Sequence, residues 1–533
     1  MNNEEIKDKI RKFHNSDENQ LSAIFNEGNL LIDAPAGCGK TKTIISKIAY
    51  ILSTNEELNF KRILTLSFSI NAASNMKREI EEKLPILINN FSKTQNLKSH
   101  IVSSNYHGLC RSILENYGYM IHESLREINS FTIAEDIGYE SDIINRYLIE
   151  SEKNILLEFD NAVKKYDYAY IESNKSNYIN LIKNNLLNNR IITYNGIILF
   201  VLEVFRKFPN IKQFYNQYFK YVIVDEFQDT NYISWLLLNE IICKDTKLIL
   251  VGDSLQRIYG FIGAIPGIFN LAIDRFRLTH IKLNTNYRFS DNRKMLLLDK
   301  NLRKLSENSL NPQIEQNVDL EINLYRDQEM EAYGVIKYIL EFLELNRNIC
   351  ILFKTKAFNK NAECIMNILD ENNIEYFYSM FSENDNIYKN FHSRTLNEFS
   401  NFITEVKILD KKARQKFIEK IKVVYELDTS KEISSLIKLL EILFTKGLSN
   451  YRYISNTDKI ALVTDVLRNK LLKNYIQYVD EKVVISTIHT SKGLEWDYVI
   501  IPDFEQFSFP NYKGWSYVNI LDTKSQTFFM MHF

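Results

Sequence analysis

The chain has 533 residues, of which 45% are hydrophobic and 25% are charged, a balance typical of a globular protein with about two to four domains. Its 66 basic and 67 acidic residues give a formal net charge of −1, which argues against a protein that binds polyanions over its whole surface but allows a local basic groove. The N-terminus lacks the apolar core of a signal peptide, and no run approaches the roughly 18 apolar residues of a membrane helix. The five cysteines are scattered without a C-x-x-C pair, which favours reduced thiols in the cytoplasm over disulfides or a zinc site.

Residues 1–28 are expected to be helical, with Ser16 or Asp17 as the cap of a helix. Gln20 lies in this region, about ten residues before an apolar run. Because its amide both donates and accepts hydrogen bonds, Gln20 is either a solvated helix residue or a group that reads adenine. The run itself, residues 30–32, predicts a buried strand that leads into a glycine loop and then an amphipathic helix.

The glycine loop has the properties of a phosphate-binding site. Gly37 and Gly39 permit backbone conformations that turn successive N–H groups inward, and the helix N-terminus adds positive potential. We expect Lys40 to reach the terminal phosphates of a bound polyphosphate and the Thr41 hydroxyl to bind Mg²⁺. The strict phosphate-loop pattern has glycine at the position of Ala34. The residues expected to contact the nucleotide here are Ala36, Gly37, Cys38, Gly39, Lys40, Thr41 and Lys42.

Two further strands, at residues 62–67 and 100–104, are each followed by candidate binding residues. Phe68 follows the first strand, and Tyr106 and His107 follow the second. A single histidine is usually structural, but open α/β sheets bind ligands at the carboxyl ends of their strands, which favours a functional role here. Residues 115–195 then read as an inserted helical subdomain without strand–glycine–helix units.

The sheet resumes with a buried strand at residues 221–224 that ends in two carboxylates. Asp225 can hold Mg²⁺ through water, and Glu226 can polarise an attacking water as a general base. The strand at residues 247–251 precedes Gln256, which is placed to contact a γ-phosphate and sense its loss. The strand at residues 280–283 precedes Arg288, which is either an arginine finger or part of an exposed salt bridge.

Residues 293–345 predict a helical connector, and its polar stretch 306–319 predicts an interdomain linker. A second α/β unit follows, with strands at residues 348–353, 374–377, 482–487 and 498–501 and a helix at about residues 358–371. Residues from about 380 to 478 are again helical in pattern and predict another insertion.

Together these motifs resemble those of the UvrD/Rep/PcrA helicases of superfamily one, over residues from about 13 to 503. The resemblance implies an α/β fold with two RecA-like P-loop domains that have parallel sheets, each interrupted by a mostly helical subdomain. It implies that ATP binds between these domains and that the protein moves 3′ to 5′ along single-stranded DNA. The expected boundaries are 1–114 and 196–290 for the first domain, 115–195 for its insertion, 291–379 and 481–533 for the second domain, and 380–480 for its insertion.

The resemblance also implies residue roles with ATP and Mg²⁺ as ligands. Gln20 would read adenine, Tyr287 would pack on it, and Glu495 would lie at the ribose. Glu226 and Gln228 match the DExQ box, with Asp225 and Thr41 at the metal. Gln256 would contact the γ-phosphate, and Arg288 would act as the first arginine finger. The residues expected to contact DNA are Phe68, Tyr106, His107, Phe261 and His489.

Two departures from the family pattern affect what is expected of turnover. Ile262 stands where the family has arginine after the stacking aromatic, and nothing after Trp496 resembles the last motif, which supplies a second arginine finger. Three explanations stay open for the second departure. The chain is truncated or its frame disrupted, a partner supplies the arginine, or the protein is an ATP-binding and DNA-binding switch.

The expected function is that of an ATP-dependent 3′–5′ DNA helicase or translocase acting on single-stranded or partly duplex DNA, in DNA repair or antiphage defence. A nuclease or another protein is an expected partner, and no membrane association is expected. The alternatives are a hydrolysis-impaired switch, a motor on RNA, and a helicase–nuclease fusion. No carboxylate–lysine nuclease cluster is evident near the end of the sequence, which disfavours the fusion.

Overall fold

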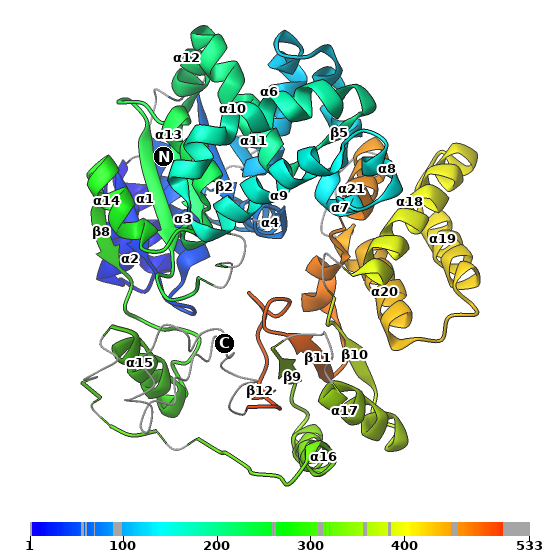
Figure 1. Cartoon of the computed structure of the whole chain (residues 1–533). Helices are drawn as coiled ribbons and strands as arrows, with labels where there is room; N and C mark the ends of the chain where they lie inside the picture. Colours follow the sequence, from blue (N-terminus) through cyan, green and yellow to red (C-terminus); the bar gives the residue numbers. More distant parts are fainter. Residues whose placement is uncertain are drawn as a thin grey trace, which may run out of the picture. The chain divides into compact units, whose positions relative to one another are not determined.

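The computed structural model describes residues 3–504, apart from residues 55–57, 59–60, 69, 89–98, 258–259, 261–262, 308–312, 315, 319, 355–359, 382–384, 449–455 and 469. The chain divides into two compact units, residues 1–318 and residues 319–533 (Figure 1). The division falls at the polar stretch that the sequence predicts as a linker.

The first unit is built on a six-stranded sheet in which every described pair of neighbouring strands is parallel, in the order β3-β2-β6-β7-β1-β8. Its four central strands read as nearly continuous apolar runs because both faces of the sheet are covered there. The strands are β1 (Leu30–Asp33), β2 (Arg62–Ser67), β3 (Ile101–Asn105), β6 (Phe219–Asp225), β7 (Lys247–Gly252) and β8 (Thr279–Lys282).

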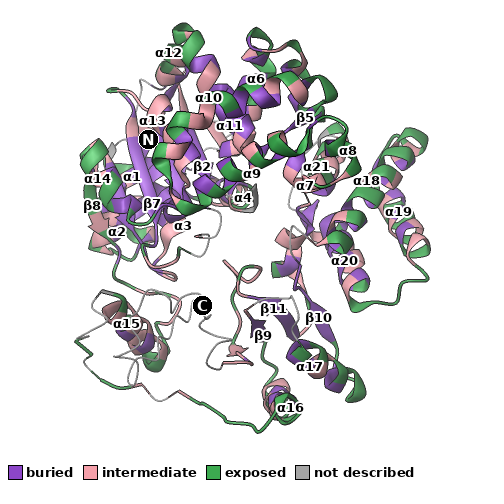
Figure 2. Ribbon diagram, viewed as in Figure 1, coloured by how far each residue is buried: buried purple, intermediate pink, exposed green. Residues whose placement is uncertain are grey.

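Alternate side chains of each central strand enter different hydrophobic cores, as the two-residue period of a strand requires. In β1, Leu30 and Ile32 enter one core while Leu31 enters the other. Figure 2 shows the labelled strands β2 and β7 as buried. One face is covered by α1 (Asn3–Phe13), α2 (Glu18–Phe25), α3 (Lys40–Thr54) and α4 (Ile70–Leu87), and the other by α6 (Tyr106–Tyr117), α11 (Tyr194–Lys207), α13 (Tyr232–Ile241) and α14 (Ile268–Phe276).

The helical insertion shares the core of the second face and has no separate core of its own. Between α6 and α11 lie η2 (Gly118–Met120), η3 (Glu123–Ser130), α7 (Ala134–Ile137), α8 (Asp142–Asn145), α9 (Glu150–Lys165), α10 (Tyr168–Asn185) and η4 (Leu187–Asn189). A short parallel pair, β4 (Thr132–Ile133) with β5 (Ile191–Ile192), ties its two ends together. The sequence did not indicate this pair, because two-residue strands carry no periodic signal. The remaining elements among the described residues of the unit are α12 (Pro209–Tyr218), η5 (Phe227–Asp229) and α15 (Arg293–Glu307).

The second unit contains a four-stranded parallel sheet in the order β10-β11-β9-β12. Its strands are β9 (Ile349–Phe353), β10 (Tyr376–Tyr378), β11 (Val483–Thr487) and β12 (Tyr498–Ile500). The helices α16 (Gln328–Glu344) and α17 (Lys360–Glu371) accompany the sheet. The second insertion comprises α18 (Asn386–Val406), α19 (Lys411–Val424), α20 (Lys431–Ile442), η7 (Leu443–Gly447), α21 (Asn456–Arg468) and η8 (Leu472–Tyr478).

The fold class is therefore the predicted one: two RecA-like α/β units with parallel sheets and helical insertions. Several strand bounds differ from the predicted bounds by one or two residues, as at β8 and β10, where strand ends leave little periodic signal. All five cysteines are free thiols. Within the described ranges, no helix has the length and apolar character needed to cross a membrane.

Candidate nucleotide-binding site

The glycine loop lies between β1 and α3, as predicted, and its two central glycines are required by the backbone. Gly37 has φ of 81° and Gly39 has φ of 77°, in the region that side chains disfavour. A Cβ atom on Gly37 would lie 2.5 Å from Asn286 Oδ1 and 2.7 Å from Arg288 Cβ. The loop therefore needs glycine both for its turn and for the close approach of the segment that follows β8.

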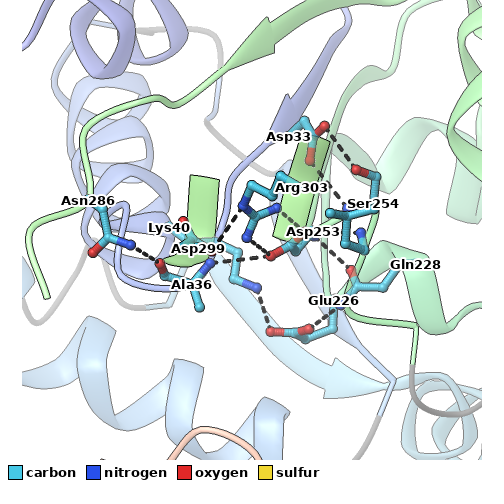
Figure 3. A network of polar contacts seen from close by, with 11 residues as sticks. Asp33, Ala36, Lys40, Glu226, Gln228, Asp253, Ser254, Asn286, Asp299 and Arg303 are labelled. Atoms are coloured by element: carbon cyan, nitrogen blue, oxygen red, sulfur yellow. Dashed lines mark hydrogen bonds and ion pairs between the residues drawn. The ribbon is translucent and has the colours of Figure 1, made fainter. Parts of the chain in front are cut away.

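Lys40 and Glu226 form an ion pair at the carboxyl edge of the sheet, with 2.7 Å between Nζ and Oε1 (Figure 3). The lysine comes from the first turn of α3 and the glutamate from the turn after β6. Their side chains are only 15% and 18% exposed. The other carboxylate oxygen of Glu226 accepts a hydrogen bond of 2.5 Å from Gln228 Nε2. The predicted phosphate lysine and the predicted general base thus lie in direct contact.

Glu226 has a left-handed backbone, with φ of 52° and ψ of 40°. This conformation costs a residue other than glycine about 1–2 kcal/mol, so the surrounding structure must impose it. Two hydrogen bonds fix the turn. The N–H of Glu226 donates to Asp225 Oδ1 at 2.9 Å, and Gln228 Oε1 accepts the N–H of Asp253 at 3.1 Å. The strain therefore occurs at the residue to which the family resemblance assigns the chemistry.

Asp253, at the end of β7, is fully buried beneath the loop. Both of its carboxylate oxygens are bound by the Arg303 guanidinium of α15, at 3.1 and 3.0 Å (Figure 3). One of them also accepts the N–H of Ala36 in the loop at 3.3 Å. The carbonyl of Asp253 accepts the N–H of Gln256 at 3.1 Å. Asp253 therefore links α15, the phosphate loop and the predicted γ-phosphate sensor.

Gln20 and Tyr287 both contact backbone carbonyls of the phosphate loop. Gln20 is buried, and its Nε2 donates to the carbonyl of Cys38 at 2.9 Å. The N–H of Tyr287 donates to the carbonyl of Gly37 at 2.8 Å, and its hydroxyl donates to Asp17 Oδ2 at 2.6 Å. Tyr287 as a whole residue is 39% exposed. These two residues, predicted to contact adenine, therefore lie on the same loop.

Asn286 binds the loop through its amide and shapes the turn that carries Arg288. Its Nδ2 donates to the carbonyl of Ala36 at 3.0 Å (Figure 3). Its Oδ1 accepts the N–H groups of Arg288 and Phe289 at 3.1 and 3.2 Å. This Asx-type turn brings Arg288 beside Gly37, so the predicted arginine finger begins at the phosphate loop.

The side chain of Lys42 lies apart from the rest of the predicted set. Its ammonium group donates to the carbonyl of Phe13 at 2.5 Å and lies 4.3 Å from the centre of the Phe13 ring. Burial lowers the pKa of Lys42. In this structure the Lys42 ammonium therefore caps the end of α1. A contact of Lys42 with a nucleotide would have to come from its backbone N–H.

The oxygen ligands expected at Mg²⁺ are the hydroxyl of Thr41, in the first turn of α3, and the carboxylate of Asp225, at the end of β6. Both are hard oxygen donors of the kind that Mg²⁺ prefers. No cluster of three or more His, Cys, Asp or Glu side chains suited to a metal occurs among the described residues. The donor set fits an ion that is held by one or two protein oxygens together with substrate phosphates.

The candidate DNA-binding residues of the first unit differ in exposure. Phe68 follows β2 and is half-buried. Tyr106 is only 1% exposed and belongs to the core, so its ring is not available to DNA here, and the direct contact expected of it does not fit this structure. The residue begins α6, whose apolar face turns inward. Phe261 lies outside the described residues.

His107 is half-buried and packs edge-on against Tyr194, with 5.4 Å between ring centres. Burial lowers its pKa to about 4, and the nearby Arg111 adds to the shift. The imidazole is therefore neutral at physiological pH. Any contact that it makes with DNA would be a hydrogen bond or a packing contact rather than an ion pair.

In the second unit, the predicted residues follow β11. Thr487 Oγ1 and Thr490 Oγ1 are 3.0 Å apart, and Thr490 Oγ1 donates to the carbonyl of Phe381 at 3.1 Å. These contacts fix the start of the turn, while His489 and Glu495 are exposed. The two predicted ligand contacts thus project from an anchored turn. Residues 505–533, which include most of the sequence after Trp496, lie outside the described residues.

Three polar groups of the site, in Asp253, Arg303 and His14, were not found from the sequence. The carboxylate of Asp253 follows a strand end, which is a usable signal, but its partner Arg303 lies 50 residues further along the chain in a helix without a distinctive motif. His14, which contacts Gln20, lies at the end of α1 and is also without a motif. Contacts between such distant positions arise from the packing of the fold, so the sequence around each residue carries no motif that would predict them.

Comparison with known families assigns both units. The family model described as the UvrD/REP helicase N-terminal domain matches residues 15–277, and that of the UvrD-like helicase C-terminal domain matches residues 380–524. The first match includes the phosphate loop and Glu226, and the second includes the turn after β11.

Individual relatives are similar over half to about two thirds of the chain. The ATP-dependent DNA helicase PcrA of Leuconostoc citreum is 27% identical over 372 residues, 63% of this chain and 46% of that protein. The proteins of the same name from Staphylococcus epidermidis and from Staphylococcus aureus strain Mu50 are 29% and 27% identical, over 50% and 52% of this chain. Each match covers less than half of the relative's own length. The two matched domains, together with the phosphate-loop and DExQ residues that meet at one sheet edge, show that the chain belongs to the UvrD/Rep/PcrA-like helicase family.

Proposed function

We propose that the chain is an ATP-dependent motor that moves 3′ to 5′ along single-stranded DNA and separates partly duplex DNA. The observation that carries the proposal is the contact of Lys40 with Glu226 at the edge of the sheet, with Gln228 on the same carboxylate. A phosphate-binding lysine beside a general base is the arrangement that nucleotide hydrolysis needs. The names of the PcrA relatives support DNA as the polymer.

The ion pair suggests how nucleotide binding prepares the base. Phosphate oxygens compete with Glu226 for the Lys40 ammonium, and their binding would release one carboxylate oxygen to accept a proton from the attacking water. Gln228 would keep the other oxygen in place. When bound, Mg²⁺ would be held by Thr41 and Asp225 and would neutralise phosphate charge.

Gln256 and Arg288 are proposed as the residues that respond to the γ-phosphate. Both are attached to the loop, Gln256 through Asp253 and Arg288 through the Asn286 turn. Loss of the phosphate would therefore change contacts that reach the segments after β7 and β8. Phe68, His107, Phe261 and His489 are the proposed DNA contacts, and aromatic stacking, which does not depend on sequence, suits a motor.

The biological setting that we propose is DNA repair or antiphage defence. A nuclease or another protein is the proposed partner. The five free thiols support a reducing compartment, the cytoplasm.

The test compares ATP turnover by the full chain with no polymer, with single-stranded DNA and with single-stranded RNA of the same sequence. We expect strong stimulation by DNA and weak stimulation by RNA. Phe261→Ala should reduce the stimulation by more than it reduces basal turnover. Duplexes with a 3′ or a 5′ single-stranded tail then report direction, and only the 3′-tailed duplex should be unwound.

Two results would redirect the proposal. If ATP and DNA still bind but ATP turnover stays at background with DNA, the protein is a nucleotide-gated DNA-binding protein and not a motor. If RNA stimulates ATP turnover as much as DNA or more, the substrate of the motor is RNA.

A further inference from the structure

A chain of buried polar groups lies behind Gln20. His14, in the turn after α1, is 1% exposed, and Ser46, in the middle of α3, is fully buried. His14 Nδ1 contacts Gln20 Oε1, and His14 Nε2 lies 2.7 Å from Ser46 Oγ. Gln20 Nε2 continues the chain to the carbonyl of Cys38 in the phosphate loop. The Gln20 amide thus contacts His14 at one end and the phosphate loop at the other, and Ser46 contacts His14 on its far side.

The chemistry of the groups sets the direction of every hydrogen bond in this chain. The carbonyl of Cys38 can only accept, so the NH₂ end of Gln20 must face it and the oxygen must face His14. His14 therefore donates from Nδ1, which makes Nε2 the acceptor for the Ser46 hydroxyl. One tautomer of a neutral ring satisfies all the partners.

The neighbourhood of His14 keeps the ring neutral. Burial lowers the pKa of His14, and the ammonium of Lys42 lowers it further, while the carboxylate of Asp17 and the bond to Gln20 act in the opposite direction. A protonated ring would have to donate from Nε2 as well. Because the pKa of His14 is lowered from its ordinary value, the neutral ring predominates at physiological pH.

We propose that His14 is a positioning residue that fixes the amide of Gln20 and so sets the preference of the site for adenine over guanine. The proposal rests on the proposed role of Gln20 as the base-reading residue. Adenine offers a donor and an acceptor side by side at N6 and N7, and an amide matches both, whereas guanine offers two acceptors at O6 and N7. An amide that is free to rotate can turn its NH₂ end toward either acceptor of guanine.

Rotation of the amide is opposed at both ends. Turning Gln20 by 180° would set its NH₂ group against the N–H of His14 and its oxygen against the carbonyl of Cys38. One new contact would face two donors toward each other and the other would face two acceptors. Because these atoms are buried, water cannot replace the lost hydrogen bonds, and the rotation is costly. Without His14, only the bond to Cys38 would oppose the rotation.

The test measures dissociation constants of the full chain for ADP and for GDP in the presence of Mg²⁺ by titration calorimetry. His14→Leu removes the donor, whereas His14→Gln keeps a donor for Gln20 and an acceptor for Ser46. We expect wild type to prefer ADP, His14→Leu to lower the GDP-to-ADP ratio of dissociation constants by about tenfold, and His14→Gln to restore most of it. Because each ratio is taken within one variant, a smaller folded fraction does not change it.

Gln20→Ala separates the failure of this inference from the failure of the proposed role of Gln20. If Gln20→Ala loses the preference but His14→Leu keeps it, Gln20 reads the base without help from His14, and the inference is overturned alone. If Gln20→Ala keeps the preference, both the base-reading role and the inference are overturned. An equal loss in His14→Leu and His14→Gln would also contradict it, because a packing defect would then explain the effect.

Discussion

The two α/β units hold their candidate functional residues in different ways. In the first unit, the phosphate loop is bound from several sides, by Gln20, by Asp253 and by Asn286. In the second unit, the turn after β11 is anchored through Thr487 and Thr490, but its candidate ligand contacts are exposed.

This difference predicts that substitutions in the two units have different effects. A loop that is held by buried hydrogen bonds before a ligand arrives loses little conformational entropy on binding. An exposed side chain such as that of Glu495 can change its conformation without disturbing a packed core. We therefore expect substitutions in the first unit to affect binding, stability and chemistry together, and substitutions after β11 to affect ligand contacts without affecting the fold.

The largest expected effect is on catalysis and comes from Lys40→Ala. The substitution removes the cation that contacts Glu226 and is expected to bind phosphates, so DNA-stimulated turnover should fall by at least about a hundredfold. Lys42→Ala is the matched control, since the Lys42 ammonium faces Phe13, and its turnover should stay within about threefold of wild type. Equal losses in the two variants, measured by phosphate release, would refute the assignment of the loop.

Arg303→Met tests whether the ion pair between Arg303 and Asp253 stabilises the first unit. It leaves the carboxylate of Asp253 buried without its guanidinium partner, which typically destabilises a protein by about 3–5 kcal/mol. Urea unfolding should show that loss. Arg293→Met, at the exposed start of α15, should change the free energy of unfolding by less than about 0.5 kcal/mol. Similar midpoints for the two variants would mean that the pair contributes little.

Glu495→Ala examines the second unit. Because the side chain is exposed, thermal unfolding should be unchanged, while the KM for ATP should rise by about tenfold if the carboxylate binds the ribose. A lower melting temperature of Glu495→Ala with an unchanged KM for ATP would contradict this expectation. Glu495 would then stabilise the turn and would not bind the nucleotide.

The smallest expected effect concerns buried acids in the helical insertion. Burial raises the pKa of Glu135 well above its usual value, the charge of Asp160 adds to this shift, and the carboxyl oxygen Oε2 is buried without a hydrogen bond. The folded state then keeps this proton to higher pH than the unfolded state, so the contribution of Glu135 to stability falls as pH rises above the usual glutamate range. Glu135→Gln should stabilise the protein by about 1 kcal/mol at pH 8, with the gain shrinking toward pH 5.

Stability curves at several pH values check this expectation. A destabilisation at pH 8 equal to that at pH 5 would show that the Glu135 carboxylate makes a favourable contact when it is ionised. Asp160 is not a suitable site for this test. It accepts hydrogen bonds from Tyr139, Tyr178 and Asn195, and its substitution would disturb all of them.

Much of the fold and part of the site follow from the sequence. Strands that are buried on both faces leave continuous apolar runs, so β1, β2, β6 and β7 lie where the sequence predicts them. The glycines of the phosphate loop and the two carboxylates after β6 are local patterns with a direct physical meaning, and they meet in space because parallel strands end at one edge.

The rest depends on packing that no local pattern reports. Arg303 reaches Asp253 from a distant helix, and His14 reaches Gln20 across a turn. Tyr106 could not be recognised as a core residue, because an aromatic residue after a strand fits a core and a stacking surface equally well. The orientation of the Lys42 ammonium likewise depends on where α1 ends.

Glu226→Gln gives the most direct test of the central claim that this sheet edge hydrolyses ATP for a DNA motor. The amide keeps a hydrogen bond with Lys40 but cannot take a proton from water. We expect binding of ADP to stay within about threefold of wild type, and ATP turnover with saturating single-stranded DNA to fall by about 10²–10⁴-fold. Turnover at the wild-type rate in Glu226→Gln, still stimulated by DNA, would contradict the claim.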